Sequence, residues 1–118
     1  MSDDRRKSLE LLERNIWPSL DVYPTRLVQR CHELRKIPIG QLTVEDLRLL
    51  IGQQKGLEHL IPVALDVLRE DPLAEGDLYP GDLMKNVLGV SEEYWKEHPE
   101  ERAEILQLTE PRHDQLSK

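Results

Sequence analysis

The 118-residue sequence has no long apolar run, a single cysteine and no export signal. A helix that crosses a bilayer needs about 18 consecutive apolar residues, and no stretch of the chain approaches that length. The N-terminal MSDDRRKSLELLERN carries charges but lacks the apolar core of a secretory signal. Cys31 cannot form an internal disulfide, which agrees with a reducing compartment. We therefore expect a soluble cytoplasmic protein with no membrane partner.

Signals for β-structure are missing as well. No segment of useful length alternates apolar and polar residues, and no hairpin dipeptide separates two apolar runs. Apolar residues recur instead at helical spacing, so the predicted fold class is all-α, a small single-domain bundle of about six short helices. We assign residues 8–109 to this domain, residues 1–7 to a flexible lead-in and residues 110–118 to a flexible tail.

Motifs for catalysis are scarce. Cys31 and His32 are adjacent, but neighbouring side chains on a helix diverge by about 100°, so they do not form a nucleophile–base pair. The other histidines show no metal-ligand spacing, and GQQKG at residues 52–56 lacks the spacing and the Ser/Thr of a phosphate-binding loop. The sequence predicts no enzymatic activity, metal or cofactor. An enzyme with an unrecognised catalytic pocket is the third of three hypotheses, after the two binding functions given below.

The strongest helical pattern lies at residues 57–70, and we expect the rest of the bundle to pack around it. Its apolar side chains follow the i, i+3, i+4, i+7 spacing of one face and cover an arc of about 200°. Pro62 removes one backbone hydrogen bond, so an irregular first turn is expected. Gly56 just before it is predicted to be left-handed, at the end of the preceding helix.

Other helices are predicted over residues 8–17, 25–36, 81–88 and 99–108, with one from Thr43 and a short turn from Ser91. Ser8, Thr43 and Ser91 suit the N-cap position because a side-chain oxygen can accept from the first-turn amides. The helical phase predicts that Ile16, Leu88 and Leu106 face inward and that Arg35 faces outward.

Acidic residues are concentrated in the C-terminal half. The formal net charge is −7; residues 1–65 are nearly neutral, and residues 66–104 carry twelve acidic against four basic side chains. Such a field repels nucleic acid and favours a basic protein partner. The alternative interpretation is that acidic helix surfaces simply keep a small protein soluble.

Within this half, EGDLYPGD at residues 75–82 combines carboxylates with an aromatic ring. Carboxylates for Lys or Arg and a ring as anchor are typical of a surface that binds a cationic partner. Alternatively, Tyr79 packs inward, and the Gly and Pro residues only shape the turn. The predicted partner-binding residues are Glu70, Asp71, Glu75, Asp77, Tyr79, Asp82, Glu92 and Glu93.

Two segments carry a family resemblance. LRLLIGQQKGLEHLIPVALDVL at residues 47–68, followed by PLAEGDLYPGDL at residues 72–83, resembles a bacterial family of contact-dependent growth inhibition (CDI) immunity proteins. The likeness includes residues 9–17 and CHELRK at residues 31–36, and it spans about residues 9–99. It implies a cytoplasmic, non-enzymatic protein that neutralises a cognate toxin domain, the C-terminal domain of a large secreted effector. Such domains are often nucleases, which are commonly basic near the active site, so an acidic inhibitor suits them.

A second class of function stays open beside this one. A helical adaptor or regulatory protein would bind a partner helix through an exposed apolar edge. An apolar patch on the folded surface would favour the adaptor, and an acidic patch would favour the immunity protein.

Overall fold

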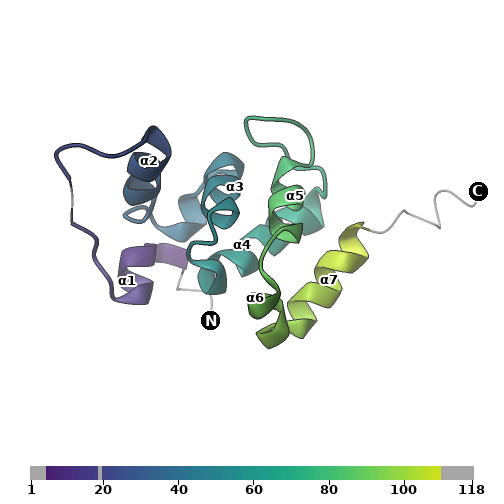
Figure 1. Ribbon diagram of the computed structural model, residues 1–118. Helices are drawn as coiled ribbons and strands as arrows, with labels where there is room; N and C mark the ends of the chain where they lie inside the picture. The colour runs from purple at the N-terminus through teal and green to yellow at the C-terminus, as the bar shows by residue number, and fades with distance from the viewer. Residues whose placement is uncertain (1–4, 19, 110–118) are drawn as a thin grey trace, which may run out of the picture.

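The computed structural model describes residues 5–18 and 20–109, and in these residues all regular structure is helical (Figure 1). The all-α prediction is confirmed. Within the described residues, seven α-helices and the 3₁₀ helix η2 follow in this order: α1 (Leu9–Glu13), α2 (Arg26–Leu34), η2 (Ile39–Gln41), α3 (Val44–Gly52), α4 (Leu57–Glu70), α5 (Asp82–Leu88), α6 (Glu92–Glu97) and α7 (Pro99–Thr109).

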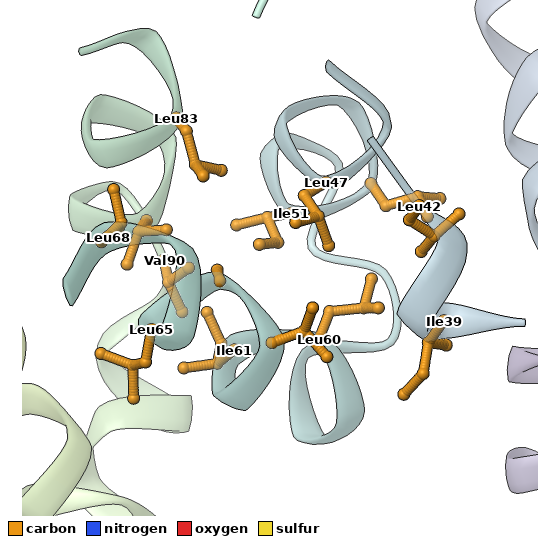
Figure 2. Close-up of a cluster of buried hydrophobic side chains, with 14 of the residues drawn as sticks. Ile39, Leu42, Leu47, Ile51, Leu60, Ile61, Leu65, Leu68, Leu83 and Val90 are labelled. Carbon is orange, nitrogen blue, oxygen red and sulfur yellow. The ribbon is translucent and has the colours of Figure 1, made fainter. Parts of the chain in front are cut away.

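Helix α4 forms the centre of the bundle, as its apolar arc predicts. It packs against η2, α3, α5 and α7, and α3 and α5 also pack closely against each other. In Figure 2, Ile51 of α3, Leu83 of α5 and Leu60, Ile61 and Leu68 of α4 belong to one cluster of buried side chains. Burial of such a continuous apolar cluster is the main favourable term in folding.

Pro62 lies inside α4 and does not end it. The helix begins at Leu57 as predicted, and its apolar register continues across the proline. Gly56 before it has a φ of 61°, which confirms the predicted left-handed residue. A Cβ atom on Gly56 would lie 2.8 Å from the Cδ atoms of Leu9, so this junction also brings α1 against α4.

The predicted caps form at Ser8, Thr43 and Ser91, where each side chain accepts a hydrogen bond from the backbone N–H three residues later. Thr25 caps α2 in the same way, a cap that was not predicted. At Thr43 the cap is reciprocal: the Asp46 N–H donates to its hydroxyl at 3.1 Å, and its own N–H donates to the Asp46 carboxylate at 3.0 Å. Local sequence is therefore sufficient to locate where these helices begin.

Three side chains predicted to face inward are exposed. Helix α1 ends at Glu13, well before residue 17, because Arg14 adopts a left-handed conformation with a φ of 54°. The segment beyond it leaves the helical phase, and Ile16 faces solvent. Leu88 and Leu106 are on the surface as well, so those inward predictions were wrong. α5 and α7 are each buried along a narrower stripe than their apolar residues indicate.

Arg35 was predicted to face water but is only 2% exposed. Its guanidinium donates to Glu13 at 2.6 Å and to the carbonyl oxygen of Asn15 at 2.7 Å. The Trp17 ring covers it, with 4.2 Å between the guanidinium carbon and the ring centroid. The segment after α1 thus folds over the end of α2 and buries an arginine whose charge is paired.

The described residues before α1 contact the body of the bundle. Arg5 donates to the Pro62 carbonyl at 3.4 Å and pairs with Asp66 at 2.5 Å, and Lys7 accepts from the Ile39 N–H. Residues 5–7 thus contact η2 and α4, and the predicted bounds of the domain stay a prediction. Residues 1–4 and the predicted tail 110–118 lie outside the described residues. Among the described helices, none is both long and apolar enough to span a bilayer.

Candidate partner-binding surface

Seven of the eight predicted partner-binding residues fall into two groups, and the eighth, Asp82, begins α5. Glu70, Asp71, Glu75, Asp77 and Tyr79 lie at the end of α4 and in the connection to α5, residues 71–81, which we call the acidic loop. Glu92 and Glu93 begin α6, beyond the opposite end of α5 (Figure 1). The structure does not bring the eight residues together into one patch.

Asp82 holds the acidic loop from inside. It is 1% exposed, and its carboxylate accepts from the backbone N–H groups of Gly76 at 2.7 Å, Leu78 at 3.0 Å and Tyr79 at 3.4 Å. Arg48 of α3 approaches the same carboxylate at 3.6 Å. These partners use both carboxylate oxygens, so Asp82 shapes the loop from inside, and its predicted contact with a binding partner stays a prediction.

Glu45 of α3 supplies the second carboxylate that fixes the loop. It accepts from the Asp77 N–H at 2.7 Å and from Arg48 Nε at 2.7 Å. Four consecutive amides, from Gly76 to Tyr79, therefore donate to two carboxylates that come from different helices. Charge-assisted hydrogen bonds of this kind are about twice as strong as neutral ones.

The sequence gives no signal for this role of Glu45. Its spacing from Arg48 predicts only a pair within one helix, and that pair forms. The contact with the loop joins residues 32 positions apart and depends on how α3 packs against α5.

Gly76 allows the close approach between the loop and α3. A Cβ atom there would lie 2.5 Å from Glu45 Oε1 and 3.2 Å from the Glu45 Cα. A short antiparallel bridge between Glu75 and Pro80 closes the base of the turn, and the Gly81 N–H donates to the Leu73 carbonyl at 3.0 Å. The loop is thus defined by backbone contacts along its whole length.

The pKa values at this site follow from these contacts. Burial alone raises the pKa of Asp82, but the three backbone donors and Arg48 outweigh it and hold the pKa below its ordinary value. The pKa of Glu45 is lowered chiefly by the hydrogen bond from Arg48, with a further contribution from the Asp77 N–H. Both side chains stay ionised in the folded protein at neutral pH.

The outer face of the acidic loop presents carboxylates and a ring. Glu75, Asp77 and Leu78 are exposed, and Tyr79 is 40% exposed. The interpretation that Tyr79 packs inward is therefore wrong. Lys85 lies beside the ring, with its Nζ 5.9 Å from the ring centroid. The loop offers Glu75 and Asp77 to solvent, and neither forms an ion pair within the described part of the chain.

The protein's own arginines neutralise a third of the carboxylates between residues 66 and 104. The four in ion pairs are Asp66, Asp82, Glu92 and Glu104. Glu101 instead accepts a hydrogen bond from the Tyr94 hydroxyl at 2.7 Å. The remaining seven, unpaired within residues 5–18 and 20–109, are Glu70, Asp71, Glu75, Asp77, Glu93, Glu97 and Glu100.

Comparison with known proteins places this architecture in a family. A family model described as CDI immunity proteins matches residues 10–105. The chain belongs to the CDI immunity protein family. The resemblance seen in residues 47–68 and 72–83 is thereby confirmed. No curated protein and no solved structure matches the chain.

The matched range of this CDI immunity protein includes the acidic loop and everything that holds it, since α3, α4 and α5 all lie inside it. The α6 end of the immunity protein is less suited to a charged partner. The Glu92 carboxylate already accepts hydrogen bonds from both Nη groups of Arg102, each at 2.9 Å. Of the two predicted residues on α6, only Glu93 therefore keeps a carboxylate without an ion pair within the described residues.

The residues considered for chemistry lie apart within residues 5–18 and 20–109. No cluster of three or more His, Cys, Asp or Glu side chains suited to a metal occurs within the described ranges. Cys31 is buried, and burial raises the pKa of its thiol, so it is a poor nucleophile at neutral pH. His32 lies against the rings of Trp17 and Tyr23.

Proposed function

We propose that this immunity protein neutralises its cognate CDI toxin by forming a stoichiometric complex through the acidic loop, in the cytoplasm and without turnover. The toxin domain it fits is basic. The observation that carries the proposal is the loop itself: two carboxylates fix its four central amides, while Glu75, Asp77 and Tyr79 point outward.

A loop that is already in its binding shape loses little conformational entropy when a partner docks. Ordering flexible side chains and loops at an interface costs about 0.5–1.5 kcal/mol for each group, and a preformed loop avoids much of that cost. Here the network of Asp82, Glu45 and Arg48 does the ordering during folding. Binding energy is then available for the contacts themselves.

The charge of the loop supports a basic toxin, and a nuclease is the class that suits it best. A nuclease must hold a polyanion, so its active site is commonly basic, and an acidic inhibitor is steered toward it. The carboxylates at the end of α4, Glu70 and Asp71, extend the negative field of the loop along the same edge. The effector would carry this toxin as its C-terminal domain.

The decisive experiment reverses the charges of the loop without touching the residues that hold it. The double variant Glu75→Lys with Asp77→Lys is measured against the cognate toxin domain, which we expect to be encoded immediately upstream. Association is followed by stopped flow, and protection is measured in toxin-expressing cells. We expect association at low salt to slow by at least about tenfold, because steering by complementary charge accounts for orders of magnitude in association rate. Protection should fall accordingly, and the melting temperature should hardly change because both side chains are exposed.

The matched control is Glu93→Lys with Glu97→Lys on α6. It changes the net charge by the same amount, and both side chains are exposed. We expect it to slow association far less than the loop variant. Equal effects of the two double variants would show that only the net charge matters, and full protection by the loop variant would reject the acidic loop as the binding surface.

A further inference from the structure

A groove of about 340 Å³ lies beside the acidic loop, between the start of the loop, α5 and the end of α7. Its described lining includes Pro72, Leu73, Met84, Leu88 and Leu108, and Lys85 is the one charged residue in it. Met84 is buried and forms the floor, while Leu88 and the 64% exposed Leu73 form walls that face solvent. Large apolar side chains gathered around a depression are typical of an interaction site.

The groove and the acidic loop share one stretch of backbone. Leu73 lies near the start of the loop and Gly81 ends it. Both line the groove, and they are joined by the hydrogen bond from the Gly81 N–H to the Leu73 carbonyl. Glu70 and Asp71 directly precede Pro72 at the groove's edge. A partner that lies over the loop would therefore cover the groove as well.

This arrangement has the anatomy of a protein–protein interface. Such interfaces combine an apolar centre, where a few anchor side chains supply most of the affinity, with a polar rim that supplies orientation and specificity. The groove corresponds to the centre, and Glu70, Asp71, Glu75 and Asp77 correspond to an acidic rim.

We propose that the groove receives an apolar side chain of the toxin, from a segment whose flanking lysines or arginines lie over the acidic loop. This inference rests on the proposed function and adds the anchor to it. Exposed apolar residues by themselves would favour the adaptor hypothesis. The proposed anchor site explains them as part of the same binding surface as the acidic loop.

The variant Leu73→Asp separates the anchor from the charge. If affinity came from charge alone, an added carboxylate on this edge would leave binding to a basic toxin unchanged or strengthen it. If Leu73 lines the site of an anchor, the same substitution weakens binding, and we expect the Kd for the upstream-encoded toxin domain to rise about 30-fold, the range of an interface anchor. Titration calorimetry measures the Kd and the stoichiometry together.

Leu11→Asp is the matched control, since it makes the same substitution at a leucine that is 62% exposed on α1, away from the loop (Figure 1). Its Kd should equal that of the unsubstituted protein. Leu88→Ser provides a second test that leaves the loop unchanged: it removes the opposite wall and should raise the Kd about tenfold. If Leu73→Asp and Leu88→Ser both bind as the unsubstituted protein does, the anchor is rejected, whereas the acidic-loop proposal stands or falls with Glu75→Lys and Asp77→Lys.

Two other occupants of the groove give different results in the free protein. If a second copy covers it, the unsubstituted chain sediments as a dimer and Leu73→Asp as a monomer. If residues 110–118 cover it, deleting them lowers the melting temperature of the unsubstituted protein but not that of Leu73→Asp. Either result overturns the proposal that the toxin fills the groove.

Discussion

Replacing Asp82 with alanine removes the common acceptor of three backbone N–H groups in the acidic loop. The two shorter bonds, to Gly76 at 2.7 Å and Leu78 at 3.0 Å, are hydrogen bonds to a charged group, each worth about 1.5–3 kcal/mol. Part of that loss is recovered because water can reach the loop amides once the carboxylate is gone. Arg48 keeps its pairing with Glu45. We expect Asp82→Ala to lower the free energy of unfolding by about 2–4 kcal/mol and the melting temperature by about 10 °C.

Urea unfolding of Asp82→Ala and of Asp77→Ala tests this expectation. Asp77 is in the same loop, but its side chain is exposed and its amide is held by Glu45 through the backbone, so its replacement should cost less than about 0.5 kcal/mol. The two losses can be compared directly because both substitutions remove the same side chain. If Asp82→Ala is no more destabilising than Asp77→Ala, the carboxylate does not hold the loop.

The difference in stability between the unsubstituted protein and Asp82→Ala should depend on pH with a definite sign. The pKa of Asp82 is lowered in the folded protein, so its contribution is fully present above the unfolded pKa of about 3.9. As the pH falls through the lower folded value, the carboxylate is protonated and the contribution is lost. The stability gap between the unsubstituted protein and Asp82→Ala should therefore be constant near neutral pH and shrink below about pH 4. A gap that does not change between pH 7 and pH 3 would contradict the assignment.

Two further predictions concern the scaffold. Gly56→Ala should destabilise the protein by about 2 kcal/mol or more in thermal unfolding, because the φ of 61° disfavours a side chain and the new Cβ would meet buried atoms of α1 at 2.8 Å; an unchanged melting temperature would contradict the close approach. Arg69→Met should cost about 1 kcal/mol at low salt and less at 1 M salt, because Arg69 joins Glu104 of α7 to α4 through an exposed two-point ion pair. A salt-independent loss in urea unfolding would assign the effect to packing instead.

Local patterns predicted the scaffold well. The bounds of α4, its continuation through Pro62, the left-handed Gly56 and the caps at Thr43 and Ser91 depend on residues a few positions apart, so the sequence contains enough information for them. The family resemblance also rested on contiguous segments, and the family match confirms it.

Burial of charged residues was not predictable in the same way. Arg35 directly follows α2 on its polar phase, yet it is buried because Trp17 folds back over it after α1 ends early. Asp82 is an acidic residue in a segment rich in turn residues and acids, which predicts an exposed side chain. It is nevertheless buried against Arg48, which belongs to a helix distant in sequence. In both cases a contact between remote segments decides the environment, and neither helical phase nor composition reports such contacts.

The way the acidic loop is held has a consequence for specificity. Every bond that Asp82 and Glu45 make to residues 76–79 goes to a backbone amide, so none of them depends on which side chains stand at positions 75, 77, 78 and 79. Those four positions can be exchanged one at a time while the turn beneath them keeps its form and the protein stays above its stability threshold. In the proposed complex, new toxin preferences are therefore reachable by single substitutions on an unchanged support.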